Sequence, residues 1–115
     1  MTTPADLPAP PQPRDPDARI VYLTREGCHL CDVALPTVRA EADRAGTVVE
    51  VRDIDAEPAL REDWNDHVPV IAVDGAVLSR YEVDADELRR ALARGAVRGR
   101  GGARPATWLG RLLRR

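Results

Sequence analysis

The stretch Arg19–Cys31, RIVYLTREGCHLC, decides the fold of this chain of 115 residues. After Arg19 come four apolar residues, Ile20–Leu23, which are typical of a central strand covered on both faces. Polar residues and Gly27 interrupt this run, and two cysteines follow, Cys28 and Cys31. The stretch therefore predicts a buried strand, a short turn and a cysteine pair where the next element begins.

A helix is predicted from Cys28 to about Gly46. The residues of its inner face recur at helical spacing: Cys31, Leu35, Val38 and Ala42. Glycine at position 46 favours a helix end there. Pro36 removes one backbone hydrogen bond and its ring clashes with the preceding turn, so we expect a kink in a continuing helix, with an earlier end as the alternative.

A second strand and a short helix follow. Branched residues favour a strand over 48–54, and Pro58 suits the first turn of a helix that reaches about Trp64. A helix of the first one's length between two strands implies that these strands are parallel. We expect Trp64 to pack in the core.

The last part of the sequence predicts a hairpin and a final helix. Apolar stretches at 68–73 and 76–79 flank Asp74-Gly75, a strong signal for a tight antiparallel turn. Asp84 begins a capping box, and Gly95 is expected to end the helix. The whole order is β-α-β-α-β-β-α.

The two ends of the chain differ in composition from the domain between them. Residues 1–17 hold six prolines and few apolar side chains, and we expect a disordered leader. Residues 18–95 form the domain, with 10 Arg against 16 acids, a net charge of −6. Residues 96–115 carry 6 Arg and no acid. We expect there a flexible linker and a short amphipathic helix near Trp108, either a solvated tail or a contact for an anionic partner.

The cysteine pair points to chemistry rather than to a structural crosslink, because a domain of this length needs no disulfide to fold. The sequence shows no signal peptide and no membrane span, so we expect a cytoplasmic protein, in which cysteines are kept reduced. A close pair there indicates redox cycling or metal binding. A structural zinc site needs four donors, and the other histidine and cysteine side chains are only His29 and His67. We therefore expect no metal site.

Three features together resemble a known family. Cys28-His29-Leu30-Cys31 follows a buried strand, Val68-Pro69 opens a later strand, and the Asp74-Gly75 hairpin leads to the helix capped by Asp84. From Arg19 to about Gly95 the chain resembles the glutaredoxins, and among them the compact bacterial glutaredoxin-like proteins. The resemblance implies a thioredoxin-like α/β fold with a four-stranded mixed sheet. It also implies a thiol-disulfide oxidoreductase.

The resemblance also implies a cis peptide bond at Val68-Pro69, with the backbone of Val68 pairing with the substrate. His29 and Leu30 stand where many glutaredoxins have proline and tyrosine. Residues 79–83 stand before the last helix in place of the glycine pair and aspartate that usually contact glutathione.

The chemistry needs a thiolate, and free cysteine supplies only a few per cent of that form at neutral pH. The helix N-terminus would stabilise the anion on Cys28. Arg25 and His29 would lower its pKa further if they point toward the sulfur. Cys31, one turn along the helix, would resolve the mixed disulfide. The expected site is thus Cys28 and Cys31 as catalytic residues, with Arg25, His29 and Val68-Pro69 beside the substrate.

The expected partners are disulfide-containing proteins, with glutathione, another low-molecular-weight thiol or a flavoprotein reductase as electron donor. We expect no tightly bound cofactor, no nucleic acid and a monomer. The alternative is a non-catalytic module of the same fold that binds a metal or docks a partner.

Overall fold

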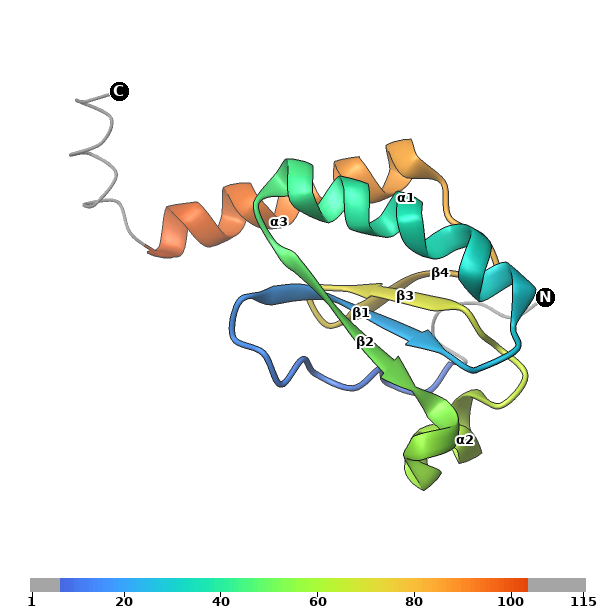
Figure 1. Cartoon of the computed structure of the whole chain (residues 1–115). Coiled ribbons are helices and arrows are strands. Elements are labelled where there is room, and N and C mark those ends of the chain that lie inside the picture. Colours follow the sequence, from blue (N-terminus) through green and yellow to red (C-terminus); the bar gives the residue numbers. More distant parts are fainter. Residues whose placement is uncertain (1–6, 104–115) are drawn as a thin grey trace.

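The structure is a computed structural model that describes the backbone of residues 7–103 and the side chains of residues 7–95. A sheet lies against two long helices on one face and a shorter helix at one end (Figure 1). The elements follow in this order: β1 (Ala18–Thr24), α1 (His29–Ala45), β2 (Val48–Asp53), the 3-10 turn η2 (Ile54–Ala56), α2 (Pro58–Trp64), β3 (Val70–Val73), β4 (Ala76–Arg80) and α3 (Ala85–Ala103).

The four strands form one mixed sheet in the order β2-β1-β3-β4. β1 and β2 are parallel, while β3 is antiparallel to β1 and β4 is antiparallel to β3. Asp74 and Gly75, at φ 51° and 87°, make the turn between β3 and β4, as a tight hairpin requires. The predicted order of elements and the mixed sheet are confirmed.

The core is divided by the sheet into two apolar clusters. On one face α1 and α3 cover alternate residues of β1 and β3. Ile20, Tyr22 and Ile71 are fully buried there. On the other face α2 covers Leu23 and Val70, because successive strand residues point to opposite sides of a sheet. Both faces of β1 are covered, which explains its continuous apolar sequence.

Trp64 is the largest fully buried side chain of the second cluster. Its ring meets the ring of His67 edge-on, with the centroids 5.9 Å apart. Its indole nitrogen is a buried side-chain polar atom without a hydrogen-bond partner in the part of the chain that the structure describes. The prediction that Trp64 packs in the core is confirmed.

The helix α1 has the ends that the sequence predicts. Gly46, at φ 77°, adopts the left-handed conformation and its N–H bonds back to carbonyls of the last turn, an arrangement that glycine makes at no steric cost. Pro36 lies inside the helix. The helix therefore continues past the proline, and the alternative of an early end is wrong.

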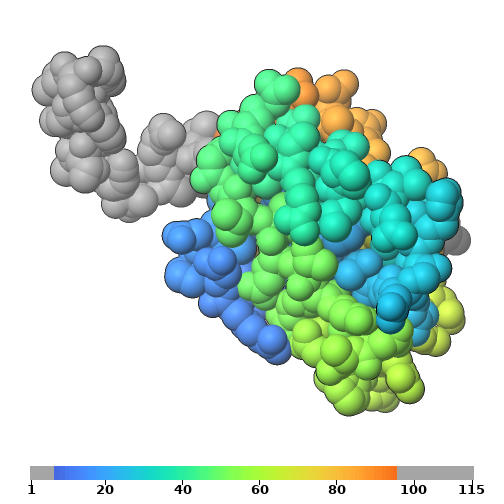
Figure 2. All heavy atoms as spheres, viewed as in Figure 1, coloured from blue at the N-terminus to red at the C-terminus, as the bar shows by residue number. Residues whose placement is uncertain are grey.

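Residues 7–17 contain no helix or strand, but they lie against the domain. The backbone N–H groups of Arg14 and Asp15 both donate to Oε1 of Glu50 on β2, at 2.7 and 2.8 Å. Leu7 packs against the cluster around Trp64. Figure 2 shows this blue segment along the green region that includes β2. The part of the expected leader that the structure describes is thus held to the sheet by polar contacts that composition does not reveal.

The sequence predicts that the last helix ends at Gly95. This prediction is wrong, because α3 continues to Ala103. Gly95 has a different reason to be glycine. A Cβ atom at this position would overlap the carboxylate of Asp74 and the guanidinium of Arg19. The ion pair between these two side chains, at 2.8 Å, packs against the helix, and Arg19 also donates to the carbonyl of Leu92 at 2.9 Å.

The predicted linker overlaps the end of α3, whereas the predicted amphipathic helix near Trp108 lies outside the described residues. Among the helices that the structure describes, none is long and apolar enough to span a membrane.

Candidate active site

The cysteine pair lies where β1 gives way to α1. Cys28 is the N-cap residue of α1 and Cys31 is in its first turn. The two form a disulfide with their Cα atoms 5.2 Å apart, a separation that suits the bond. Cys28 is partly exposed, whereas Cys31 is only 1% exposed. An incoming sulfur can therefore reach Cys28 more readily than Cys31.

The start of α1 supplies a hydrogen bond to the outer sulfur. The backbone N–H of Cys31 donates to Sγ of Cys28 at 3.1 Å. The first N–H groups of a helix have no partner inside the helix, and they form the positive end of its dipole. Both effects favour a negative charge on Sγ of Cys28 when the disulfide is reduced.

The inner cysteine is tied to the sheet through its backbone. The hydroxyl of Tyr22, on β1, donates to the carbonyl oxygen of Cys31 at 2.6 Å. Tyr22 is fully buried. Burial, and in second place the negative charge of Asp32, raises the pKa of Tyr22 to about 12, so the phenol stays protonated and keeps donating. The sequence offers no signal for this contact, because Tyr22 reads there as ordinary packing.

Val68 and Pro69 lie at the same end of the sheet as the cysteines. The peptide bond between them is cis, as the family resemblance implies. In the antiparallel register Leu23 of β1 faces Val70 of β3, so the residues before Val70 run beside the residues that lead from β1 to Cys28. Figure 1 shows the end of β1, the start of α1 and the start of β3 together at the right. Pro69 is fully buried and Val68 is partly exposed.

Arg25 is paired with a carboxylate, and His29 is exposed. The guanidinium of Arg25 makes two hydrogen bonds to the carboxylate of Asp55, at 2.7 and 3.1 Å, and two more to Asn65. Hydrogen bonding between the two charged groups raises the pKa of Arg25 and lowers the pKa of Asp55. The charge of Arg25 is thus largely balanced by Asp55. His29 is exposed on the first turn of α1.

A polar cluster that sequence reasoning missed lies beside Pro69. His67 precedes β3, and its Nδ1 lies 2.8 Å from a guanidinium nitrogen of Arg80, at the end of β4. The hydroxyl of Tyr81 donates to the carbonyl of Asp66 at 3.0 Å, and the N–H of Tyr81 donates to the carbonyl of Pro69 at 2.7 Å. Arg80 and Tyr81 carry no sequence motif, so only the pairing of β3 with β4 reveals them.

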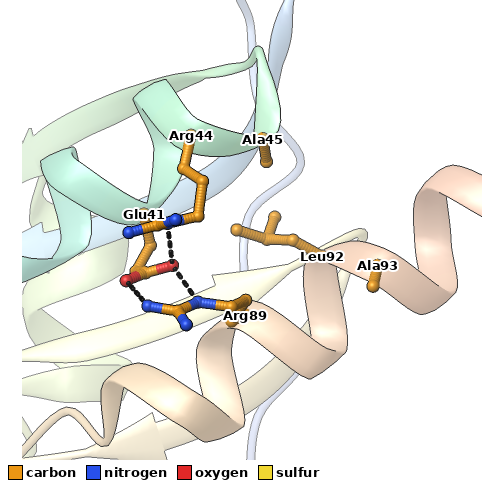
Figure 3. A pocket seen from close by; sticks show the side chains of 6 residues that line it. All are labelled: Glu41, Arg44, Ala45, Arg89, Leu92 and Ala93. Atoms are coloured by element: carbon orange, nitrogen blue, oxygen red, sulfur yellow. Dashed lines mark hydrogen bonds and ion pairs between the residues drawn. The ribbon is translucent and has the colours of Figure 1, made fainter.

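A hollow of about 230 Å³ between α1 and α3 is remote from the cysteines (Figure 3). Its rim carries Glu41, which accepts two hydrogen bonds from Arg89, at 2.8 and 2.9 Å. This ion pair joins the two helices. The hollow lies ten or more residues along α1 from Cys31 and is lined by Glu41, Arg44, Ala45, Arg89, Leu92 and Ala93. In the described part of the chain, no group of three or more His, Cys, Asp or Glu side chains is placed to hold a metal ion.

Solved structures with a similar fold include two from bacteria. The solution structure of protein Ne2328 from Nitrosomonas europaea is 30% identical, with a TM-score of 0.53, and covers 67% of this chain and 93% of that one. Thioredoxin 1 from Thermosipho africanus is 19% identical, with a TM-score of 0.54, and covers 70% and 96%. The second likeness shows the fold, which is thioredoxin-like.

The sequence also has relatives in mycobacteria. The uncharacterized protein Rv0508 of Mycobacterium tuberculosis is 31% identical over 81 residues, which are 66% of this chain and 84% of Rv0508. Residues 19–93 match the family described as glutaredoxin-like domain (DUF836). These residues include the disulfide, the cis-proline and all four strands except the first residue of β1. The chain belongs to the glutaredoxin-like domain family (DUF836).

Proposed function

We propose that this protein is a dithiol oxidoreductase that reduces disulfide bonds of protein clients. The observation that carries the proposal is the position of Cys28, a partly exposed residue whose sulfur accepts the N–H of Cys31 at the start of α1. Family membership and the thioredoxin-like fold support it. The proposed nucleophile is Cys28, and the proposed resolving residue is the buried Cys31.

The proposed reaction moves two electrons to the client. The thiolate of Cys28 attacks one sulfur of the client disulfide, so a mixed disulfide forms and the other client sulfur leaves as a thiolate. The sulfur of Cys31 then attacks Sγ of Cys28, which releases the second client thiol and closes the Cys28–Cys31 disulfide. An external reductant, which is either a low-molecular-weight thiol such as glutathione or a flavoprotein reductase, reopens that bond.

The local geometry gives each residue a separate role in this scheme. Sγ of Cys28 is stabilised as an anion by the helix N-terminus, so its pKa should lie below the ordinary value of about 8.5. Burial of Cys31 keeps competing substrates from its sulfur. Val68, at the same end of the sheet as the cysteines, is proposed to hold the client chain through its backbone.

The test combines two substitutions with a titration. Cys28→Ser should abolish disulfide reduction, whereas Cys31→Ser should accumulate a mixed disulfide with the client, visible by mass spectrometry. Thiolate absorbance of the reduced protein against pH gives the pKa of Cys28, with the Cys28→Ser variant as the baseline. A pKa at the value of free cysteine, together with unchanged turnover in Cys28→Ser, would refute the proposal. Parallel assays with glutathione and with a flavoprotein reductase identify the electron donor.

A further inference from the structure

Arg80 lies at the active-site end of the sheet, two strands away from the cysteines. In the strand register Arg80 of β4 faces Val70 of β3, and Val70 faces Leu23 of β1. These three residues form one row across the sheet. Five residues after Leu23 the chain reaches Cys28, and one residue before Val70 it passes Pro69. Arg80 therefore borders the backbone that is proposed to hold the client.

The guanidinium of Arg80 is held in place by two rings. One of its nitrogens lies 2.8 Å from Nδ1 of His67, and its central carbon lies 5.2 Å from the ring centroid of Tyr81. A guanidinium only donates hydrogen bonds, so Nδ1 of His67 is the acceptor. The hydroxyl of Tyr81 binds the carbonyl of Asp66, which fixes the ring against the loop that carries His67. Contacts with His67 and Tyr81 thus hold the side chain of Arg80 in place.

Arg80 is the one partly buried arginine among those of residues 7–95 that form no ion pair; the others, Arg39, Arg61, Arg90 and Arg94, are exposed. Six arginines form ion pairs with carboxylates: Arg14, Arg19, Arg25, Arg44, Arg52 and Arg89. In the range 7–95, Arg80 forms no ion pair, and its two contacts are the rings of His67 and Tyr81 rather than a carboxylate. Glu82, two residues beyond Arg80, and Asp66, the neighbour of His67 in sequence, are both exposed and form no ion pair with Arg80.

Such a guanidinium suits one kind of ligand. Arginine has five N–H donors, and its planar geometry matches the two oxygens of a carboxylate. Arg80 is partly buried. Water therefore screens its attraction to a bound carboxylate less than it would at a fully exposed side chain. The contacts with the two rings limit the rotation of the side chain, so little conformational entropy is lost on binding.

We propose that Arg80 is a substrate-binding residue that selects disulfide clients carrying an acidic side chain next to the reacting cysteine. This inference rests on the proposed reduction of client disulfides. The carboxylate would bind Arg80 while the client backbone lies along Val68 and its sulfur faces Cys28. His67 and Tyr81 would act as positioning residues.

The experiment compares matched substrates and matched variants. Two disulfide peptides differ only in Glu or Gln beside the cysteine, and two small disulfides, dithiodipropionate and hydroxyethyl disulfide, differ in carrying carboxylates or hydroxyls. The variants are Arg80→Gln, Arg80→Glu and, as a control of equal charge change, Arg39→Gln. Arg39 is exposed on α1, eleven residues beyond Cys28. The reduced full-length protein is assayed for kcat/KM at low and high salt.

The wild type should reduce the Glu peptide about tenfold faster in kcat/KM than the Gln peptide, the size expected for one charge-assisted hydrogen bond. The preference should arise in KM, shrink at high salt and vanish in Arg80→Gln but not in Arg39→Gln. Arg80→Glu should favour a peptide with Lys at the same position. Hydroxyethyl disulfide should be reduced equally by all variants, which checks that the fold and the cysteines are intact.

The outcomes separate the inference from the proposed function. Equal rates on Glu and Gln peptides, with hydroxyethyl disulfide still reduced, would overturn the role of Arg80 and leave the oxidoreductase standing. A preference that persists in Arg80→Gln would overturn it as well. A preference confined to dithiodipropionate would mean that the carboxylate belongs to a small thiol, so selection of acidic clients would be wrong. Failure to reduce every disulfide would refute the function and this inference together.

Discussion

Replacing Tyr22 with phenylalanine should change stability in a way that reverses with pH. The phenol is fully buried and donates to the carbonyl of Cys31 at 2.6 Å. Burial, more than the nearby charge of Asp32, raises the pKa of Tyr22 from its ordinary 10 to about 12. The fold thus stabilises the neutral phenol. The substitution removes both the hydrogen bond and this titration.

Loss of the hydrogen bond destabilises the variant, whereas loss of the Tyr22 titration makes the variant relatively more stable at high pH. Near neutral pH, Tyr22→Phe loses one buried hydrogen bond, and its free energy of unfolding should fall by about 1 kcal/mol. Because the pKa of Tyr22 is higher in the folded state, the wild-type contribution is complete below pH 10 and is lost as the pH rises through 12. Two pKa units correspond to at most about 2.7 kcal/mol. The curves of unfolding free energy against pH for wild type and variant should therefore cross at about pH 11.

Urea unfolding of the oxidised protein, followed by circular dichroism from neutral pH upward, measures both curves. The chain suits this test because its 17 basic residues are all arginine, so no lysine titrates in this range. Tyr81→Phe is the control. It removes the only other tyrosine, so tyrosinate absorbance of this variant reports Tyr22 alone. A midpoint at the ordinary value, or a stability difference that stays constant with pH, would refute the reasoning.

Three further predictions concern ion pairs and one glycine. Glu41→Gln should lower the melting temperature at neutral pH, because it removes the ion pair with Arg89. Hydrogen bonding to Arg89 lowers the pKa of Glu41, so the stability advantage of the wild type should disappear as the pH falls below 4.5. Thermal melts at several pH values measure both effects. Gly95→Ala should give no net gain of stability in urea, although alanine is favoured over glycine in a helix by about 1 kcal/mol, because the added methyl displaces an ion pair from α3. An increase in stability would contradict that packing. Arg25→Gln should leave the pKa of Cys28 within about half a unit in the thiolate titration, since this arginine is already paired, and a larger rise would show that its charge reaches the sulfur.

The elements that local patterns specify could be predicted from the sequence. The apolar run before Cys28, the helical spacing after it and the Asp74-Gly75 turn each depend on neighbouring residues, so they name strand, helix and hairpin directly. The cis bond before Pro69 followed from family resemblance and is confirmed.

What the sequence did not predict depends on contacts between distant segments. Gly95 is a common helix-ending residue type, but here its lack of a side chain leaves room for Arg19 and Asp74, which are far away in sequence. Arg25 is near Cys28 in sequence, yet its partner Asp55 arrives from the turn after β2. The support of Arg80 likewise requires the loops before β3 and after β4 to meet. No local pattern encodes these encounters.

The contact of Arg19 with Asp74 and Leu92 stabilises the end of the sheet that lies opposite the cysteines. It joins β1, the hairpin turn and α3 at the start of β1, whereas the cysteines lie past the end of that strand. Amide hydrogens around Arg19 should exchange only on global unfolding, while those near Cys28 can exchange through local opening. Making and breaking the disulfide would then leave the far end undisturbed. One strand is thus anchored at its second residue, Arg19, and leads into the loop before Cys28 at its last.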